Sequence, residues 1–237
     1  MGISPYALEM LIQHREANFF EQDQKVLQLG KQKVGNKIKC NEILTRQGLT
    51  PLSLKPDLFG DVELFQSLGF KEVFSLDASN FENADYLVDL NLELDISIPR
   101  DFDLVFDGGT AEHVFDFKQL LMNIHTLLNV GGTVVHASPS NNHVDHGFYQ
   151  FSPTVFYDWY YANNWEILDC FFFEYQTDAD NIPWRWFKYE PGSLDPISFG
   201  GLNDSLWGTW FVAKKTKSAT SDVIPQQGFY QRQREWK

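Results

Sequence analysis

The chain has 237 residues, of which 43% are hydrophobic and 16% aromatic, which is enough for one large core. The sequence contains no run of about 18 apolar residues, the length needed to cross a bilayer. Nineteen basic residues stand against thirty-two acidic ones, and the formal charge of −13 would repel a polyanion such as a nucleic acid. Since the N-terminus also lacks the basic-then-apolar order of a signal peptide, we expect a cytoplasmic protein that binds neither membranes nor nucleic acids.

Hydrophobic periodicity predicts alternating helices and strands along the chain. The first half is expected to contain, in order, a helix over residues 5–20, a strand over 26–29, a polar stretch to residue 56, a helix over 57–68 and strands over 73–76 and 84–90. The second half is expected to contain a strand over 102–106, a helix over 117–128, a strand over 133–137, a helix over 152–161 and strands over 165–173 and 209–213. His14, on the first helix, is expected to face solvent.

This order of elements indicates an α/β protein whose mainly parallel sheet is covered by helices on both faces. The nearly continuous apolar run over residues 102–106 is typical of a strand buried on both faces. We expect a helical segment over 1–23, a main domain over 24–215 and a polar tail over 216–237. Within the main domain, residues 181–205 are rich in Pro, Gly and Trp and are expected to form a lid-like insertion or a packed surface loop.

Polar side chains gather where two of the predicted strands end. The strand over 102–106 runs into Asp107 and a glycine-containing turn that carries Glu112 and His113. A second polar cluster, from His136 to His146, follows the next strand. Ligands of open α/β sheets bind outside the carboxyl ends of the strands, so both clusters are expected at a ligand-binding edge.

Three segments resemble the class I S-adenosylmethionine-dependent methyltransferases. They are the ends of the second and fourth strands, Phe74-Ser-Leu-Asp77 and Phe102 through Val114, and the entry to the fifth, Leu127 through Val135. The likeness covers about residues 24–215. It implies a doubly wound, Rossmann-like methyltransferase fold, with a seven-stranded, mostly parallel sheet that includes a late antiparallel strand.

The same resemblance implies which residues bind S-adenosylmethionine. Asp77, which closes the second strand, would hold the ribose hydroxyls, because a carboxylate accepts hydrogen bonds from both at once. Asp89, at the end of the third strand, matches a position that approaches the adenine edge. Gly30 and Asp107, at the ends of the first and fourth strands, complete the expected cofactor contacts.

The loop after the first strand departs from the family's pattern, in which several glycines let the backbone approach the cofactor closely. Here the sequence is Gly30-Lys-Gln-Lys-Val-Gly35, with only Gly30 in the expected place. The spacing of Gly30 and Gly35 is similar to that of a phosphate-binding P-loop, but Asn36 stands where that motif needs a lysine, which excludes a P-loop. The alternative function is therefore a non-catalytic, methyltransferase-like binding or assembly protein that has lost its cofactor.

The Glu112-His113 pair, together with the segment from Asn142 to Pro153, resembles the metal-assisted O-methyltransferases. In those enzymes a divalent ion orients the acceptor and lowers the pKa of its hydroxyl group, so that an oxygen nucleophile exists near neutral pH. Carried over by position, the ligands would be Glu112, His113 and His146, with His143 less certain.

One ligand of that family is replaced here by Gly109, and Asp107 is the candidate to substitute for it. Without a metal ion, His146 or His113 would act as the general base, since the pKa of histidine lies near neutral pH. The sequence thus predicts an S-adenosylmethionine-dependent methyltransferase, directed at an oxygen of a small hydroxylated metabolite or sugar conjugate.

Overall fold

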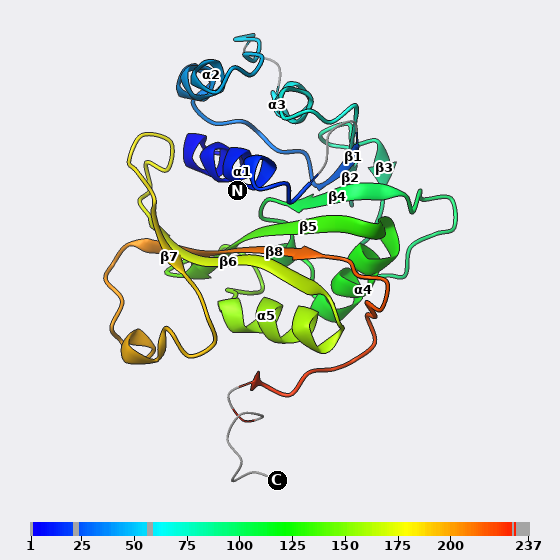
Figure 1. Ribbon diagram of the computed structural model, residues 1–237, viewed down its shortest axis with the longest axis vertical. Helices are drawn as coiled ribbons and strands as arrows, with labels where there is room; N and C mark the ends of the chain where they lie inside the picture. The colour runs from blue at the N-terminus through cyan, green and yellow to red at the C-terminus, as the bar shows by residue number, and fades with distance from the viewer. Residues whose placement is uncertain (1, 21–23, 56–58, 229, 231–237) are drawn as a thin grey trace.

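The computed structural model describes residues 2–20, 24–55, 59–228 and 230. Its centre is one sheet with the strand order β3-β2-β1-β4-β5-β8-β6-β7 (Figure 1). The strands are β1 (Lys25–Leu29), β2 (Glu72–Asp77), β3 (Tyr86–Leu87), β4 (Phe102–Asp107), β5 (Leu128–Asn141), β6 (Glu166–Tyr175), β7 (Arg185–Lys188) and β8 (Leu206–Lys214). Strands β1 to β5 run parallel to one another, whereas β8 runs antiparallel to both β5 and β6.

The predicted α/β fold with a mostly parallel sheet and a late antiparallel strand is confirmed, but the sheet has eight strands instead of seven. The additional strand is β7, which pairs antiparallel with β6 and lies inside the predicted insertion over 181–205. Its four residues, Arg-Trp-Phe-Lys, place a charge at either end and follow no apolar alternation. Pairing with the aromatic strand β6 gives this segment its extended conformation, and such long-range pairing leaves no local signal.

Helices cover both faces of the sheet (Figure 1). One face is covered by α1 (Pro5–Glu16), α2 (Lys37–Arg46) and α3 (Asp61–Ser67), the other by α4 (Phe117–Leu127) and α5 (Pro153–Ala162), and two short 3-10 helices are η1 (Ala111–His113) and η2 (Asp195–Ile197). None of the helices in the described part of the chain is both long enough and apolar enough to cross a membrane.

Helix α2 lies in the stretch that was expected to be merely polar. It buries only Cys40, Ile43 and Leu44, too few to produce a clear apolar stripe in the sequence. Asn36 begins the helix, because its side chain accepts a hydrogen bond from the backbone N–H of Lys39 at 3.2 Å. The predicted start of the next helix, at residue 57, lies outside the described residues.

The alternation of side chains along β4 divides the core into two layers. Leu104 and Phe106 pack on the side of α1 and α3, whereas Val105 packs on the side of α4 and α5. Phe102 also packs on the α4 and α5 side, because the strand is irregular between Phe102 and Leu104. Asp107 continues this alternation, so its carboxylate lies on the α5 side at the carboxyl end of the strand. A buried strand therefore delivers an acidic group to the edge where ligands bind in α/β sheets.

His14 is buried instead of facing solvent, with 2% of its surface exposed. The indole N–H of Trp210 on β8 donates a hydrogen bond to its Nε2 at 2.8 Å, and the ring of Phe19 stacks on the imidazole. Burial lowers the pKa of His14 to about 4, although the nearby carboxylate of Asp169 opposes this shift. A neutral imidazole thus joins α1 to the sheet.

Replacing His14 by Gln is expected to remove one source of acid sensitivity. The neutral form of His14 is favoured in the folded state, whereas in the unfolded chain its pKa returns to about 6.5. Above pH 6.5, the imidazole is neutral in both states and its burial does not lower the free energy of unfolding. As the pH falls towards 4, the unfolded chain binds a proton that the folded protein excludes, and the free energy of unfolding decreases by roughly 2 to 3 kcal/mol. Urea unfolding of wild type and His14→Gln between pH 7.5 and 4.5 measures this. The difference in unfolding free energy should shift in favour of the variant at low pH, and a difference independent of pH contradicts the assignment.

Candidate active site

A buried hydrogen-bonded chain connects the ends of β4, β5 and α5. Asp107 Oδ2 lies 2.7 Å from His136 Nδ1, and His136 Nε2 lies 2.7 Å from the hydroxyl of Tyr160. All three residues are fully buried. Burial opposes ionisation of Asp107, but the hydrogen bond from His136, together with those from the backbone N–H groups of Thr110 and Ala111, holds the pKa of Asp107 below its usual value. The carboxylate is therefore ionised, Nδ1–H donates to it, and the Tyr160 hydroxyl donates to Nε2.

The other oxygen of Asp107 fixes the turn that follows β4. Its Oδ1 accepts hydrogen bonds from the backbone N–H groups of Thr110 and Ala111, at 2.9 and 3.2 Å. These bonds position η1, which carries Glu112 and His113. The predicted roles of Asp107 as a cofactor contact or substitute metal ligand stay predictions, and both of its oxygens are engaged within the protein.

Glu112 is fully buried, yet neither of its carboxylate oxygens has a hydrogen-bond partner among the described residues. Its Oε1 lies 3.6 Å from His146 Nε2 and 3.9 Å from His113 Nε2. Burial, with a smaller contribution from the charge of Asp107, raises the pKa of Glu112 to about 7. Buried polar groups nearly always have a hydrogen-bond or ionic partner, so this carboxylate is a candidate to bind a cation or a hydrogen-bond donor of a ligand.

The segment after β5 brings His146 to Glu112 through backbone contacts. The N–H groups of Phe148 and Tyr149 both donate to the carbonyl oxygen of Glu112, at 2.7 and 3.3 Å. A Cβ on Gly147 would lie 2.8 Å from the same oxygen, closer than real Cβ atoms come. Only glycine allows this approach, so Gly147 is part of the site although the sequence analysis did not single it out.

Three of the predicted metal ligands converge. The ligand atoms of Glu112, His113 and His146 all lie within 4.8 Å of one another. In a tetrahedral site with metal bonds of about 2.1 Å, the ligand atoms lie about 3.4 Å from one another. The distances from Glu112 Oε1 to the Nε2 atoms of His146 and His113, 3.6 and 3.9 Å, are close to this value. His143 does not belong to this group, and its Nε2 lies 2.6 Å from the hydroxyl of Tyr175.

A second group of residues meets at the ends of β1, β2 and β4. Gly30 has a φ of +70°, and a Cβ there would lie 3.1 Å from Thr110 Oγ1 and 4.0 Å from Asp77 Oδ2. Thr110 Oγ1 donates to the carbonyl of Leu29 at 2.5 Å. Asp77 uses Oδ1 to accept the N–H of Ser79. Gly30 and Asp77, both predicted to bind the cofactor, are thus neighbours at this edge.

Asp89, the fourth predicted cofactor residue, is exposed in a turn. Its Oδ1 accepts hydrogen bonds from the backbone and side chain of Asn91, at 2.9 and 2.8 Å. These bonds lower the pKa of Asp89. Its contact with an adenine ring stays a prediction.

Gln32 also belongs to this region, although it was not among the cofactor-binding residues predicted from the sequence. Its side chain is 4% exposed, and Nε2 donates to the carbonyl oxygens of Leu29 and Gly30, both at 3.2 Å. A Cβ on Gly108 would lie 2.4 Å from Gln32 Oε1, which has no partner in the described structure. The carboxamide thus fills the space beside Gly30 and Gly108, where loop glycines were expected to leave room.

No protein-family model and no curated protein matches the chain. Among solved structures, the YcgJ protein from Bacillus subtilis is 11% identical, with 88% of this chain and 99% of that chain covered at a TM-score of 0.53. The strand order, with the antiparallel strand β8 beside β5, is that of the Rossmann-like methyltransferase fold expected from the sequence, and the overlay extends over most of both chains. The chain has the class I methyltransferase fold.

Two further structures of lower similarity also overlay on this methyltransferase fold. A SAM-dependent methyltransferase from Archaeoglobus fulgidus is 13% identical, with 87% of this chain and 93% of that chain covered at a TM-score of 0.48. The 1,6-didemethyltoxoflavin-N1-methyltransferase from Burkholderia thailandensis, solved with S-adenosylhomocysteine, is 14% identical, with coverages of 89% and 78% and a TM-score of 0.41.

Replacing Tyr160 by Phe tests the buried chain from Asp107. The change removes one oxygen and leaves Nε2 of His136 as a buried acceptor without a partner, which costs about 1 to 3 kcal/mol. Tyr161→Phe is the matched control, since Tyr161 is exposed. Urea unfolding at pH 7.5 should show a loss of stability only for Tyr160→Phe. Equal stability of the two variants would mean that the Tyr160 hydroxyl contributes nothing to this network.

Proposed function

We propose that this protein is an S-adenosylmethionine-dependent methyltransferase that transfers a methyl group to an oxygen of a small hydroxylated metabolite or sugar conjugate. The observation that carries the proposal is the buried, unpaired carboxylate of Glu112 facing two imidazoles at the carboxyl edge of a methyltransferase fold. Such a group is costly to keep unless a ligand or ion pairs with it. The same edge also carries the residues that suit the cofactor.

The cofactor suits the residues at the ends of β1 and β2. Asp77 has one oxygen accepting the N–H of Ser79 and the other directed towards Gly30, so it offers acceptors to a pair of ribose hydroxyls. Gly30 leaves open a space that a Cβ would crowd against Thr110. The unpaired Oε1 of Gln32 is a buried acceptor that suits a donor group of a ligand bound there. When bound, S-adenosylmethionine supplies an electrophilic methyl group.

A divalent metal ion suits the second group of residues. Glu112, His113 and His146 would hold it, and two imidazoles with one carboxylate form a common ligand set for such ions. When bound, the ion would act as a Lewis acid towards the acceptor hydroxyl. Burial and the neighbouring His146 lower the pKa of His113, so its imidazole is neutral near pH 7.

Without a metal ion, His113 or His146 would instead serve as the general base. His113 and His146 are half exposed, so an acceptor arriving from solvent can reach them. A neutral imidazole accepts a proton from the acceptor hydroxyl as the oxygen is methylated. The buried chain from Asp107 keeps η1, and hence His113, in a fixed position during this step.

Cofactor binding tests the proposal against a non-catalytic, methyltransferase-like protein. Isothermal titration of the full chain with S-adenosylhomocysteine should give a measurable dissociation constant, and Asp77→Ala should weaken it by roughly tenfold or more, because the ribose loses a charged acceptor. Asp204→Ala, a change of an exposed aspartate in the insertion, is the control and should bind as wild type does. No heat of binding and no thermal shift at millimolar ligand would favour the non-catalytic alternative.

Metal binding is tested with Glu112→Gln. The variant keeps the shape of the side chain but removes its negative charge, so titration with Zn²⁺ or Mn²⁺ should show a loss of affinity of roughly tenfold or more. In EDTA, the same variant should unfold at the same temperature as wild type or higher, because an unpaired buried carboxylate destabilises the metal-free protein.

His125→Gln provides the control for an imidazole outside the site, since His125 lies on α4 and contacts the carbonyl of Ala219. Its metal affinity should match that of wild type. Full methyltransferase activity in excess EDTA, or unchanged metal affinity in Glu112→Gln, would contradict the metal assignment and leave His146 or His113 as a general base.

A further inference from the structure

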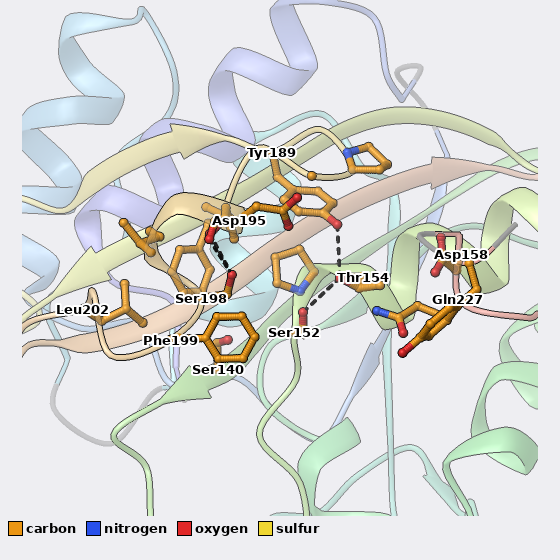
Figure 2. A pocket seen from close by; sticks show the side chains of 17 residues that line it. Ser140, Ser152, Thr154, Asp158, Tyr189, Asp195, Ser198, Phe199, Leu202 and Gln227 are labelled. Carbon is orange, nitrogen blue, oxygen red and sulfur yellow. Dashed lines mark hydrogen bonds between the residues drawn. The ribbon is translucent and has the colours of Figure 1, made fainter. Parts of the chain in front are cut away.

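A second cavity of about 650 Å³ lies on the α5 side of the sheet (Figure 2). Its walls come from the ends of β5 and β6, the first turns of α5, the segment after β7 and the C-terminal residues Gln227 and Tyr230. Small-molecule sites usually have volumes of about 300 to 1,000 Å³, so this cavity has the size of a binding site.

This cavity is distinct from the candidate active site. Glu112, His113 and His146 are not among the residues that line it. Thr154 and Asp158, both on α5, line the cavity. The cavity is therefore on the α5 face of the sheet.

The polar groups of the cavity are mainly hydroxyls. A connected series runs from Ser152 Oγ to Thr154 Oγ1 and on to the hydroxyl of Tyr189, with both distances 3.1 Å (Figure 2). Ser140, Ser198 and Tyr230 add three more hydroxyl groups, of which Ser198 donates to the carbonyl oxygen of Asp195 at 2.8 Å. Because hydroxyls both donate and accept, such a wall matches a ligand that is itself rich in hydroxyl groups.

The charges of the cavity exclude anionic ligands. Two carboxylates, Asp158 and Asp195, line it, and the described lining residues include no lysine, arginine or histidine. Asp158 is held in place by the backbone N–H of Gly228, which donates to Oδ2 at 2.7 Å. A phosphate or carboxylate would meet like charge without a compensating cation, whereas a neutral hydroxyl would find acceptors.

Aromatic side chains supply apolar faces beside these polar groups. Phe172 is buried at the base of the cavity and held by a stacked Trp207, with ring centroids 4.9 Å apart. Phe199 at the rim is 99% exposed, so no packing within the described structure accounts for it. Its ring is therefore accessible to a ligand, and aromatic side chains beside a few polar groups are common in small-molecule sites.

We propose that this cavity binds a neutral carbohydrate, a glycosyl unit without phosphate or carboxylate groups. A sugar ring has an apolar C–H face, which suits Phe199, and a hydroxylated edge, which suits the series from Ser152 to Tyr189 and the carboxylates. The six hydroxyl side chains outnumber the two carboxylates, which favours a polyol over an organic cation. The site requires neither the cofactor nor the metal ion, and its occupancy does not depend on the proposed methyl transfer.

Saturation-transfer-difference NMR and a glycan array with the full chain test this inference. The NMR probes are the methyl glycosides of glucose, galactose, mannose and N-acetylglucosamine, with glucose 6-phosphate and spermidine as charged comparisons. At least one neutral sugar should bind, and Phe199→Ala should weaken its binding by roughly tenfold, because the apolar face of the ring loses its platform. The exposure of Phe199 means that this change should leave the fold intact.

Two controls separate this site from the rest of the molecule. Phe81→Ala removes another highly exposed phenylalanine, outside the cavity, and should leave sugar binding unchanged. Glu112→Gln should also bind the sugar as wild type does, so the outcome is independent of the metal and cofactor tests. Absence of binding to every neutral sugar, a preference for spermidine or glucose 6-phosphate, or binding unaffected by Phe199→Ala would overturn the proposal.

Discussion

The hydrogen-bonded chain from Asp107 through His136 to Tyr160 joins two parallel strands, one helix and the turn after β4. Such a network is stable in a buried setting only when every member has a partner. Here the carboxylate receives two backbone N–H groups and one imidazole N–H, and the tyrosine hydroxyl satisfies the remaining imidazole nitrogen. The position of Glu112 and His113 follows from this chain, because η1 begins at the residues that Asp107 binds.

The helices and strands that could be predicted from the sequence are those whose own residues show a clear pattern of apolar side chains. Strand β4 is apolar on both faces, and α4 carries a regular apolar stripe, so both were placed within a residue or two. Helix α2 and strand β7 were missed for the opposite reason. Helix α2 buries only a few side chains, and β7 depends on hydrogen bonds to β6 that no local pattern records.

The candidate site shows the same division. Glu112 and His113 are adjacent in the sequence, and His146 follows the next strand, so sheet topology alone brought them to one edge. The hydrogen-bond partners of Asp107 could not be predicted, because the alternation of side chains along a strand gives the face on which a carboxylate lies but not the group that it contacts there. Gly147 and Gln32 depend on tertiary contacts, one with the Glu112 backbone and one with Gly108.

The buried acceptors without a hydrogen-bond partner among the described residues include the carboxylate of Glu112 and the carboxamide oxygen of Gln32, both at the carboxyl edge of the sheet. Each costs about 1 to 3 kcal/mol while it lacks a partner, and a charged group costs more. Folding alone gives no reason to keep them, because an apolar side chain at either position would remove this cost. The cost is offset if a cation pairs with Glu112 and a donor group of a ligand pairs with Gln32. The loop after β1 carries lysine and glutamine where the family pattern has glycines. The unpaired acceptors favour a loop that still binds a ligand over a loop that has lost this ability.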